Sequence, residues 1–169
     1  MQLSYNRPSF LGSLPSGADG TTETLRLMRE LVLKYKTDPS VRGLALELVQ
    51  PLAARDWRGE IRALFEYVRD RIRYVHDIAG VETLQTPPAT VELEAGDCDD
   101  KSTLLSALLA AVGYRSRLVA VGYQQPGDYQ HVYVEVNAGE GGWIPMDATV
   151  ARPFGWRPRD AVARMVLMV

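Results

Sequence analysis

The sequence contains a single cysteine, Cys98, among its 169 residues. One thiol excludes an intramolecular disulfide, a zinc site built from several cysteines, and an iron–sulfur cluster. The chain also lacks a basic N-terminus followed by an apolar run, and it has no stretch of roughly 18 to 20 apolar residues that could cross a bilayer. These absences predict a cytoplasmic protein with no membrane partner.

Neither sign of charge dominates the composition. Nineteen Lys and Arg residues stand against 21 Asp and Glu, and the basic residues form no block. We therefore expect no nucleic-acid partner. The hydrophobic share of 46% excludes a disordered or low-complexity chain, and the length suits a single domain with its own core.

The first two thirds of the chain are predicted to be helical behind a short arm. Residues 1–20 combine Gly, Pro and Ser without periodicity, which is typical of an extended arm, and residues 21–169 are predicted to form one domain. Residues 77–95 are predicted to be a loop stiffened by Pro87 and Pro88. Apolar residues recur at helical spacing after four capping positions, namely Thr21 or Thr22, Asp38, Asp56 and Asp97. The fourth of these helices is apolar on several faces and is predicted to be central and buried.

Beyond the fourth helix the pattern changes to that of strands. Residues 118–123 and 131–136 are predicted to be strands, and residues 143–149 form the returning strand of a hairpin. Helices followed by an antiparallel sheet define an α+β fold. The apolar segment at residues 162–169 is expected to be ordered and at least half buried. It either adds a strand or helix to its own domain, which we favour, or packs on a second subunit.

Cys98 is predicted to occupy the first position of the fourth helix. Unpaired N–H groups and the helix dipole there favour a thiolate with a lowered pKa, which would make the sulfur a usable nucleophile. The neighbouring Asp97, Asp99 and Asp100 act in the opposite direction and would raise the pKa. A nucleophilic Cys98 therefore needs a cationic partner, and the alternative is a small buried side chain.

Two histidines could supply that partner. His76 follows the third predicted helix, where a surface or capping role is expected. His131 opens the strand at residues 131–136, on the face opposite three alternating valines. It can meet a helix N-terminus that packs there, and the alternative is an exposed strand histidine.

The predicted hairpin brings an acid to His131. If the strands pair through a five-residue turn, Tyr133 lies opposite Asp147, and Asp147 becomes the diagonal neighbour of His131 at about 7–8 Å between Cα atoms. A carboxylate that fixes one ring nitrogen, so that the other faces a thiol, is the arrangement of a nucleophile triad. The sequence therefore predicts the triad Cys98, His131 and Asp147.

Three sequence blocks in this order resemble the transglutaminase-like superfamily of papain-like cysteine enzymes: GDCDDKSTLLSALLAAVGYRSRLVAVGY, HVYVEV and GWIPMDAT. The resemblance covers residues 95–149 and implies N-terminal helices and a central cysteine-bearing helix packed on an antiparallel sheet. It implies Cys98 as nucleophile, His131 as base and acid, and Asp147 as the orienting residue. An upstream side chain often completes the oxyanion hole, and Gln85 is the candidate, with a plain loop residue as the alternative. The preceding FEYVRDRIRYVHD and ETLQTP look like bacteriophage and prophage forms.

The resemblance implies acyl transfer on amide bonds of a protein or peptide, through a thioester and without metal or organic cofactor. We favour hydrolysis, because excluding water requires a tunnel that a chain of this size has little material to build. Protein crosslinking is the alternative, and a non-catalytic phage-particle or assembly module, which could be a homo-oligomer, is another. An acetyltransferase would need a coenzyme thioester, and the sequence has no glycine loop to hold its phosphates.

Overall fold

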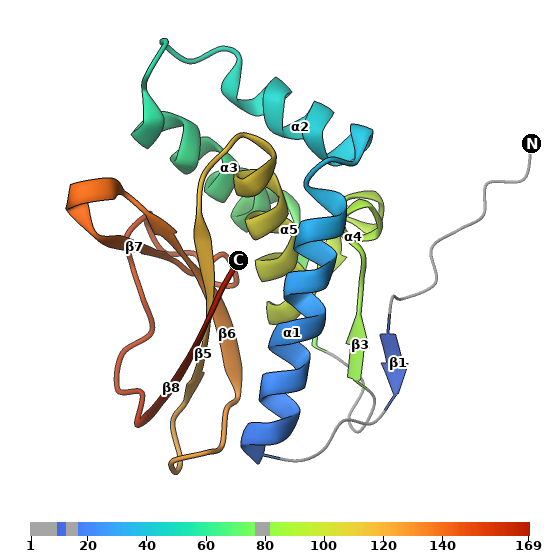
Figure 1. The fold of residues 1–169 in the computed structure, drawn as a ribbon, viewed down its shortest axis with the longest axis vertical. Helices are drawn as coiled ribbons and strands as arrows, with labels where there is room; N and C mark the ends of the chain where they lie inside the picture. The colour runs from blue at the N-terminus through green and yellow to red at the C-terminus, as the bar shows by residue number, and fades with distance from the viewer. Residues whose placement is uncertain (1–9, 13–16, 77–81) are drawn as a thin grey trace, which may run out of the picture.

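The computed structural model describes residues 10–12, 17–76 and 82–169. Helices α1 and α5 lie against one face of a four-stranded sheet, and the remaining helices surround α5 (Figure 1). The helices of the described chain are α1 (Gly17–Tyr35), α2 (Pro39–Val49), α3 (Trp57–Arg71), α4 (Pro87–Leu93) and α5 (Cys98–Ala111), with a 3₁₀ turn at Gly139–Gly141. Among them, no helix is long and apolar enough to span a membrane.

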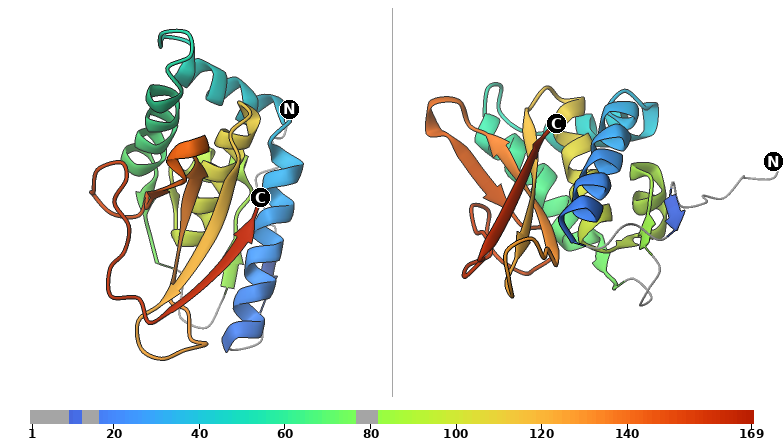
Figure 2. Two further views of the ribbon diagram at one scale, coloured as in Figure 1. Left: turned by 60° about the vertical axis from the view of Figure 1, so that its left-hand side comes forward. Right: turned by 60° about the horizontal axis from the view of Figure 1, so that its bottom comes forward.

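Helix α5 is the centre of the molecule. It packs against α1, α2, α3 and α4 on its sides and against the sheet, and every residue from Asp100 to Leu109 is buried. The bottom view shows α5 between the sheet and α4 (Figure 2). The prediction of a central buried fourth helix is therefore confirmed.

The sheet is antiparallel throughout, in the order β7-β6-β5-β8. Its strands are β5 (Ser116–Gly122), β6 (His131–Asn137), β7 (Trp143–Met146) and β8 (Ala163–Met168). In the β6–β7 hairpin Val136 pairs with Ile144, the register expected from the turn length. Helices before an antiparallel sheet confirm the α+β prediction.

The C-terminal segment completes the sheet of its own domain. Strand β8 pairs along the length of β5, and its inward residues Met165 and Leu167 pack against the core. The alternate residues Val166 and Met168 are 37% and 41% exposed, so most of their surface is covered as predicted. Val162 departs from the prediction, because it precedes the strand and is 55% exposed.

The prediction of a loop at residues 77–95 is wrong for the part that the structure describes. Strand β3 (Glu82–Leu84), helix α4 and strand β4 (Ala95–Gly96) lie there, and residues 77–81 lie outside the described ranges. Thr86 caps α4 by accepting a hydrogen bond from the Ala89 N–H. Two prolines then occupy the first helical positions, where no backbone donor is needed, so they begin a helix.

The first helix begins at Gly17, four residues before the expected caps. The hydroxyls of Thr21 and Thr22 instead bond back to the carbonyls of Gly17 and Ala18 inside the helix. Within the arm, β1 (Phe10–Gly12) pairs antiparallel with β3. The apolar residues Tyr5 and Leu14, from which we expect the arm to dock on another surface, lie outside the described residues.

Two adjacent positions of β8 test its role in stability. Leu167→Ala removes a side chain that packs on the core, and should lower the free energy of unfolding by about 1–3 kcal/mol, less than for a fully buried leucine. Met168→Ala, on the exposed face, should change it by less than about 0.5 kcal/mol. Denaturant titration measures both, and equal effects would show that β8 contributes little to the core.

Candidate active site

Cys98 is the first residue of α5, and a network of carboxylates fixes the turn around it. Asp97 caps the helix by accepting hydrogen bonds from the N–H groups of Asp99 and Asp100 at 2.9 and 3.0 Å. Asp100 returns the interaction by accepting from the Asp97 N–H at 3.3 Å. This reciprocal capping box pre-organises the backbone that carries the sulfur.

The strand before Cys98 requires glycine. Strands β2 (Arg73–Tyr74) and β4 pair in parallel, with Tyr74 opposite Gly96. A Cβ atom at Gly96 would lie 2.6 Å from the Cβ of Asp100, far inside van der Waals contact. The glycine two residues before Cys98 thus allows the chain to pass close to the helix that it enters.

His131 and Asp147 form a direct hydrogen-bonded pair. The imidazole Nε2 lies 2.8 Å from Oδ2 of Asp147, so the diagonal placement predicted from the hairpin is present. The Asp147 side chain is 1% exposed and that of His131 is 16% exposed, which leaves the ring reachable from outside. When Nε2 carries the proton and donates to Asp147, Nδ1 is the ring nitrogen left free to accept another.

The other oxygen of Asp147 is occupied as well. Oδ1 accepts from the N–H and the hydroxyl of Thr149, at 3.0 and 2.6 Å. Burial raises the pKa of Asp147, but the hydrogen bonds from His131 and Thr149 together lower it by more. The pKa of Asp147 therefore lies below the usual value for aspartate. The carboxylate therefore stays ionised and keeps a fixed orientation toward the ring.

The first turn of α5 packs on the start of β6, which brings Cys98 to the residues that follow His131. The backbone of Val132 interacts with the Cys98 sulfur, and the Ser102 hydroxyl donates to the Val132 carbonyl at 3.3 Å. Cys98 as a whole residue is partly exposed, although its thiol is largely desolvated. A nucleophilic atom, an imidazole and an oriented carboxylate thus share one end of the α5–sheet interface.

Of the two opposing influences expected on the Cys98 pKa, the one that raises it prevails. Burial raises the pKa of the thiol, the carboxylates of Asp99 and Asp97 raise it further, and the backbone of Val132 only partly opposes them. The sulfur lies 3.4 Å from Oδ1 of Asp99, to which it donates. Desolvation and local negative charge therefore favour the neutral form of the Cys98 thiol.

The backbone of Gln85 is hydrogen-bonded to the same turn of α5. Its N–H donates to Oδ1 of Asp100 at 2.8 Å, which fixes the chain just before α4. Its side-chain Oε1 is buried and accepts no hydrogen bond from any residue within the described ranges. Since amide oxygen and nitrogen exchange by a flip, the buried and unpaired end of this amide is either an acceptor or a donor.

The Transglutaminase-like superfamily matches residues 43–148 of this sequence, which are more than half of the chain and include Cys98, His131 and Asp147. The chain belongs to this superfamily. No match was found among curated proteins.

Solved structures with the same transglutaminase-like fold are distant in sequence. A proposed protease from Parabacteroides distasonis ATCC 8503 has a TM-score of 0.60 at 14% identity, over 77% of this chain and 26% of its own. A proposed cysteine protease from Cytophaga hutchinsonii has a TM-score of 0.56 at 20% identity, over 83% and 50%. The periplasmic domain of TgpA from Pseudomonas aeruginosa has a TM-score of 0.50 at 21% identity, over 72% and 47%. The chain therefore spans at most half the length of these three structures.

Two further side chains of this transglutaminase-like site were not foreseen from the sequence. Tyr74 pairs with Gly96, two residues before Cys98, and burial together with the carboxylates of Asp97, Asp99 and Asp147 raises the pKa of its phenol to about 12. Lys101 follows Cys98 by one helical turn and is buried. The spacing from Cys98 could have indicated Lys101. Tyr74 is brought to the site by the parallel pairing of β2 with β4, which the sequence pattern did not predict.

His76, as expected, is exposed, with its ring 4.9 Å from that of Tyr74.

The acidic environment of Cys98 gives a testable pH dependence. Asp99→Asn removes the charge that raises the thiol pKa most, so more thiolate forms at a given pH. We expect iodoacetamide to alkylate Cys98 several-fold faster in this variant at pH 7.5, and the midpoint of the rate profile to move to lower pH. Glu30→Gln, an equal charge change on the exposed face of α1, should leave the profile unchanged. Identical profiles for both variants would contradict the assigned role of Asp99.

Proposed function

We propose that this protein catalyses thiol-dependent acyl transfer on amide bonds of a protein or peptide, with water as the acceptor. The observation that carries the proposal is the His131–Asp147 pair at 2.8 Å, next to a cysteine at the start of a buried helix. A histidine whose tautomer is set by a buried carboxylate can move a proton to and from a neighbouring thiol. The two neighbours described as proteases support the same class of reaction.

In the proposed first step, the Cys98 sulfur attacks the amide carbonyl and its proton passes to Nδ1 of His131. Because the resting thiol is neutral, this transfer accompanies the attack instead of preceding it. Asp147 stabilises the imidazolium that forms. His131 then gives the proton to the leaving amine as the C–N bond breaks, which leaves a thioester on Cys98.

The tetrahedral intermediate places a negative charge on the former carbonyl oxygen. The Cys98 N–H lies in the first turn of α5, where the N–H groups lack helical partners and the helix dipole favours an anion. The amide of Gln85 is the proposed second donor, since its side chain is buried with one end unpaired and its backbone is held by Asp100. Two donors aimed at the developing charge constitute an oxyanion hole.

Hydrolysis of the thioester is favoured over transfer to a lysine-like amine. Cys98 and His131 are both partly exposed, so water can reach the thioester and be deprotonated by His131. Mass spectrometry of products formed from a peptide mixture, with and without an added primary amine, separates the two outcomes. Hydrolysed peptides should dominate even with the amine present, and mainly amine-linked products would assign a crosslinking activity instead.

The triad is tested by mutational coupling. Cys98→Ala and His131→Ala should each lower peptide hydrolysis by at least about 10³-fold while the protein stays folded, and the double variant should be little worse than either. The two residues act in one step, so the second change removes nothing further. Losses that multiply in the double variant, or hydrolysis that survives in Cys98→Ala, would contradict the proposed mechanism.

Gln85 is tested separately from the triad. Gln85→Ala should lower turnover by about 10²-fold, because one donor to the oxyanion is lost, while iodoacetamide labelling of Cys98 stays unchanged. Gln50→Ala, an exposed glutamine at the end of α2, is the matched control. A loss below about threefold would assign the role of second donor to another group.

A further inference from the structure

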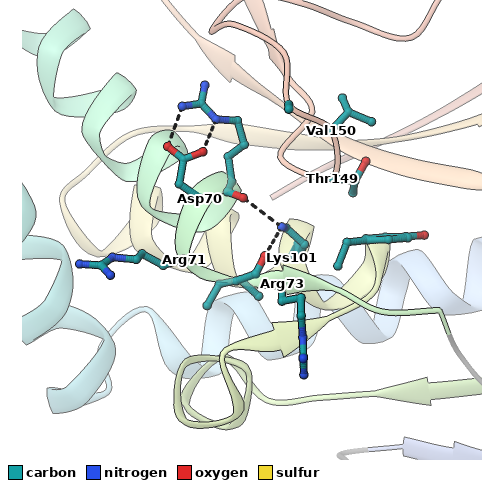
Figure 3. Close-up of a pocket in the computed structure, with 10 residues that line it drawn as sticks. Asp70, Arg71, Arg73, Lys101, Thr149 and Val150 are labelled. Carbon is teal, nitrogen blue, oxygen red and sulfur yellow. Dashed lines mark hydrogen bonds and ion pairs between the residues drawn. The ribbon is translucent and has the colours of Figure 1, made fainter.

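A cavity of about 300 Å³ adjoins the site, and the mechanism above leaves it unused. Its wall is formed by the end of α3 with the following strand β2, by one residue of α5, and by the segment after Asp147 (Figure 3). The lining residues are Arg69 to Tyr74, Lys101, and Thr149 to Ala151.

The cavity contains a buried cation. Lys101 is 1% exposed, and its ammonium donates to the carbonyls of Arg69 and Ile72, where α3 ends. An ammonium group has three N–H donors, so these two carbonyls leave one donor for another acceptor. Burial lowers the pKa of Lys101 to about 8, against the opposing influence of Asp147 and Asp70, so the group is still mostly charged at neutral pH.

Positive charge predominates among the remaining lining residues. Arg69 and Asp70 bind each other through two hydrogen bonds of 2.6 and 2.7 Å, so they largely neutralise one another. Arg71 and Arg73 are exposed and project away from Lys101 on different sides of the cavity (Figure 3). They add positive potential at its rim, while Lys101 is the cation inside.

Three connections hold the cavity beside the reacting atoms. Lys101 follows Cys98 by one turn of α5, and Thr149 donates two hydrogen bonds to Asp147. Tyr74 pairs with Gly96, two residues before Cys98. A group bound in the cavity would therefore lie close to an amide held at Cys98.

We propose that this cavity binds a carboxylate of the substrate close to the scissile amide, an inference that rests on the proposed acyl transfer at Cys98. The free donor of Lys101 and the hydroxyl of Tyr74 are the groups that would receive it. Asp97 and Asp99 repel anions from the sulfur, so only a local cation would make an acidic substrate preferable to a neutral one. The carboxylate belongs either to an acidic side chain or to the end of a peptide chain.

Affinity labelling of Cys98 tests the proposal without requiring turnover. Three reagents share one electrophile: N-chloroacetyl-glutamate α-amide carries a side-chain carboxylate, N-chloroacetyl-glutamine carries an α-carboxylate, and N-chloroacetyl-glutamine α-amide is neutral. We expect at least one acidic reagent to alkylate Cys98 about ten-fold faster than the neutral one, as a charge-assisted hydrogen bond allows. The faster acidic reagent identifies the source of the carboxylate. If neither exceeds the neutral reagent, as repulsion by the aspartates alone would produce, the proposal is wrong.

Variants then assign the effect to the cavity. Lys101→Met should abolish the preference for the acidic reagent, measured as the ratio of the acidic to the neutral labelling rate within the same variant, whereas Lys34→Met, an equal charge change on the exposed side of α1, should preserve that ratio. If Lys101→Met does not fold, Arg71→Gln combined with Arg73→Gln should reduce the preference two- to five-fold. An unchanged preference in every folded cavity variant would overturn the proposal. Failure of the proposed hydrolysis would appear in the peptide assay and would leave the labelling order intact.

Discussion

The carboxylate of Asp100 holds together three parts of the chain on which the site depends. One oxygen accepts from the Gln85 N–H, and the other accepts from the Asp97 N–H at the entrance to α5. The side chain is 1% exposed, so these hydrogen bonds satisfy a charge that is out of contact with water. Its neighbour Gly96 has no Cβ because Asp100 occupies that space. The position of Cys98 follows from this packing.

Such a carboxylate is a strong constraint because it must be fully paired to be tolerated. Removing either partner would leave a buried charge less well compensated, which is more destabilising than losing a surface hydrogen bond. The neighbouring Asp97 and Asp99 make the Cys98 thiol harder to ionise. The turn that positions Cys98 therefore also favours its protonated form.

The sequence predicted the parts of this fold that rest on local periodicity. Alternating valines located β6, turn length set its register with β7, and that register placed Asp147 at His131. Local sequence patterns did not predict contacts between residues far apart in the chain. They also did not decide between two structures where a residue is compatible with both. Pro87 and Pro88 are equally compatible with a stiff loop and with the first turn of a helix, and the Thr86 cap decided between them. The cavity could not be predicted from the sequence, because Lys101 contacts the end of α3 only in the folded chain.

The contact between α1 and β8 couples the two ends of the domain during unfolding. Thr22 of α1 donates to the sulfur of Met165 in β8, across a separation of 143 residues, and α1 packs along that strand. Closing so large a loop is slow, but once closed it links the two ends of the domain thermodynamically. Release of β8 would uncover α1 and the edge of β5 together. Amide hydrogens in these three elements should therefore exchange as one cooperative unit, distinct from the turn that carries Cys98.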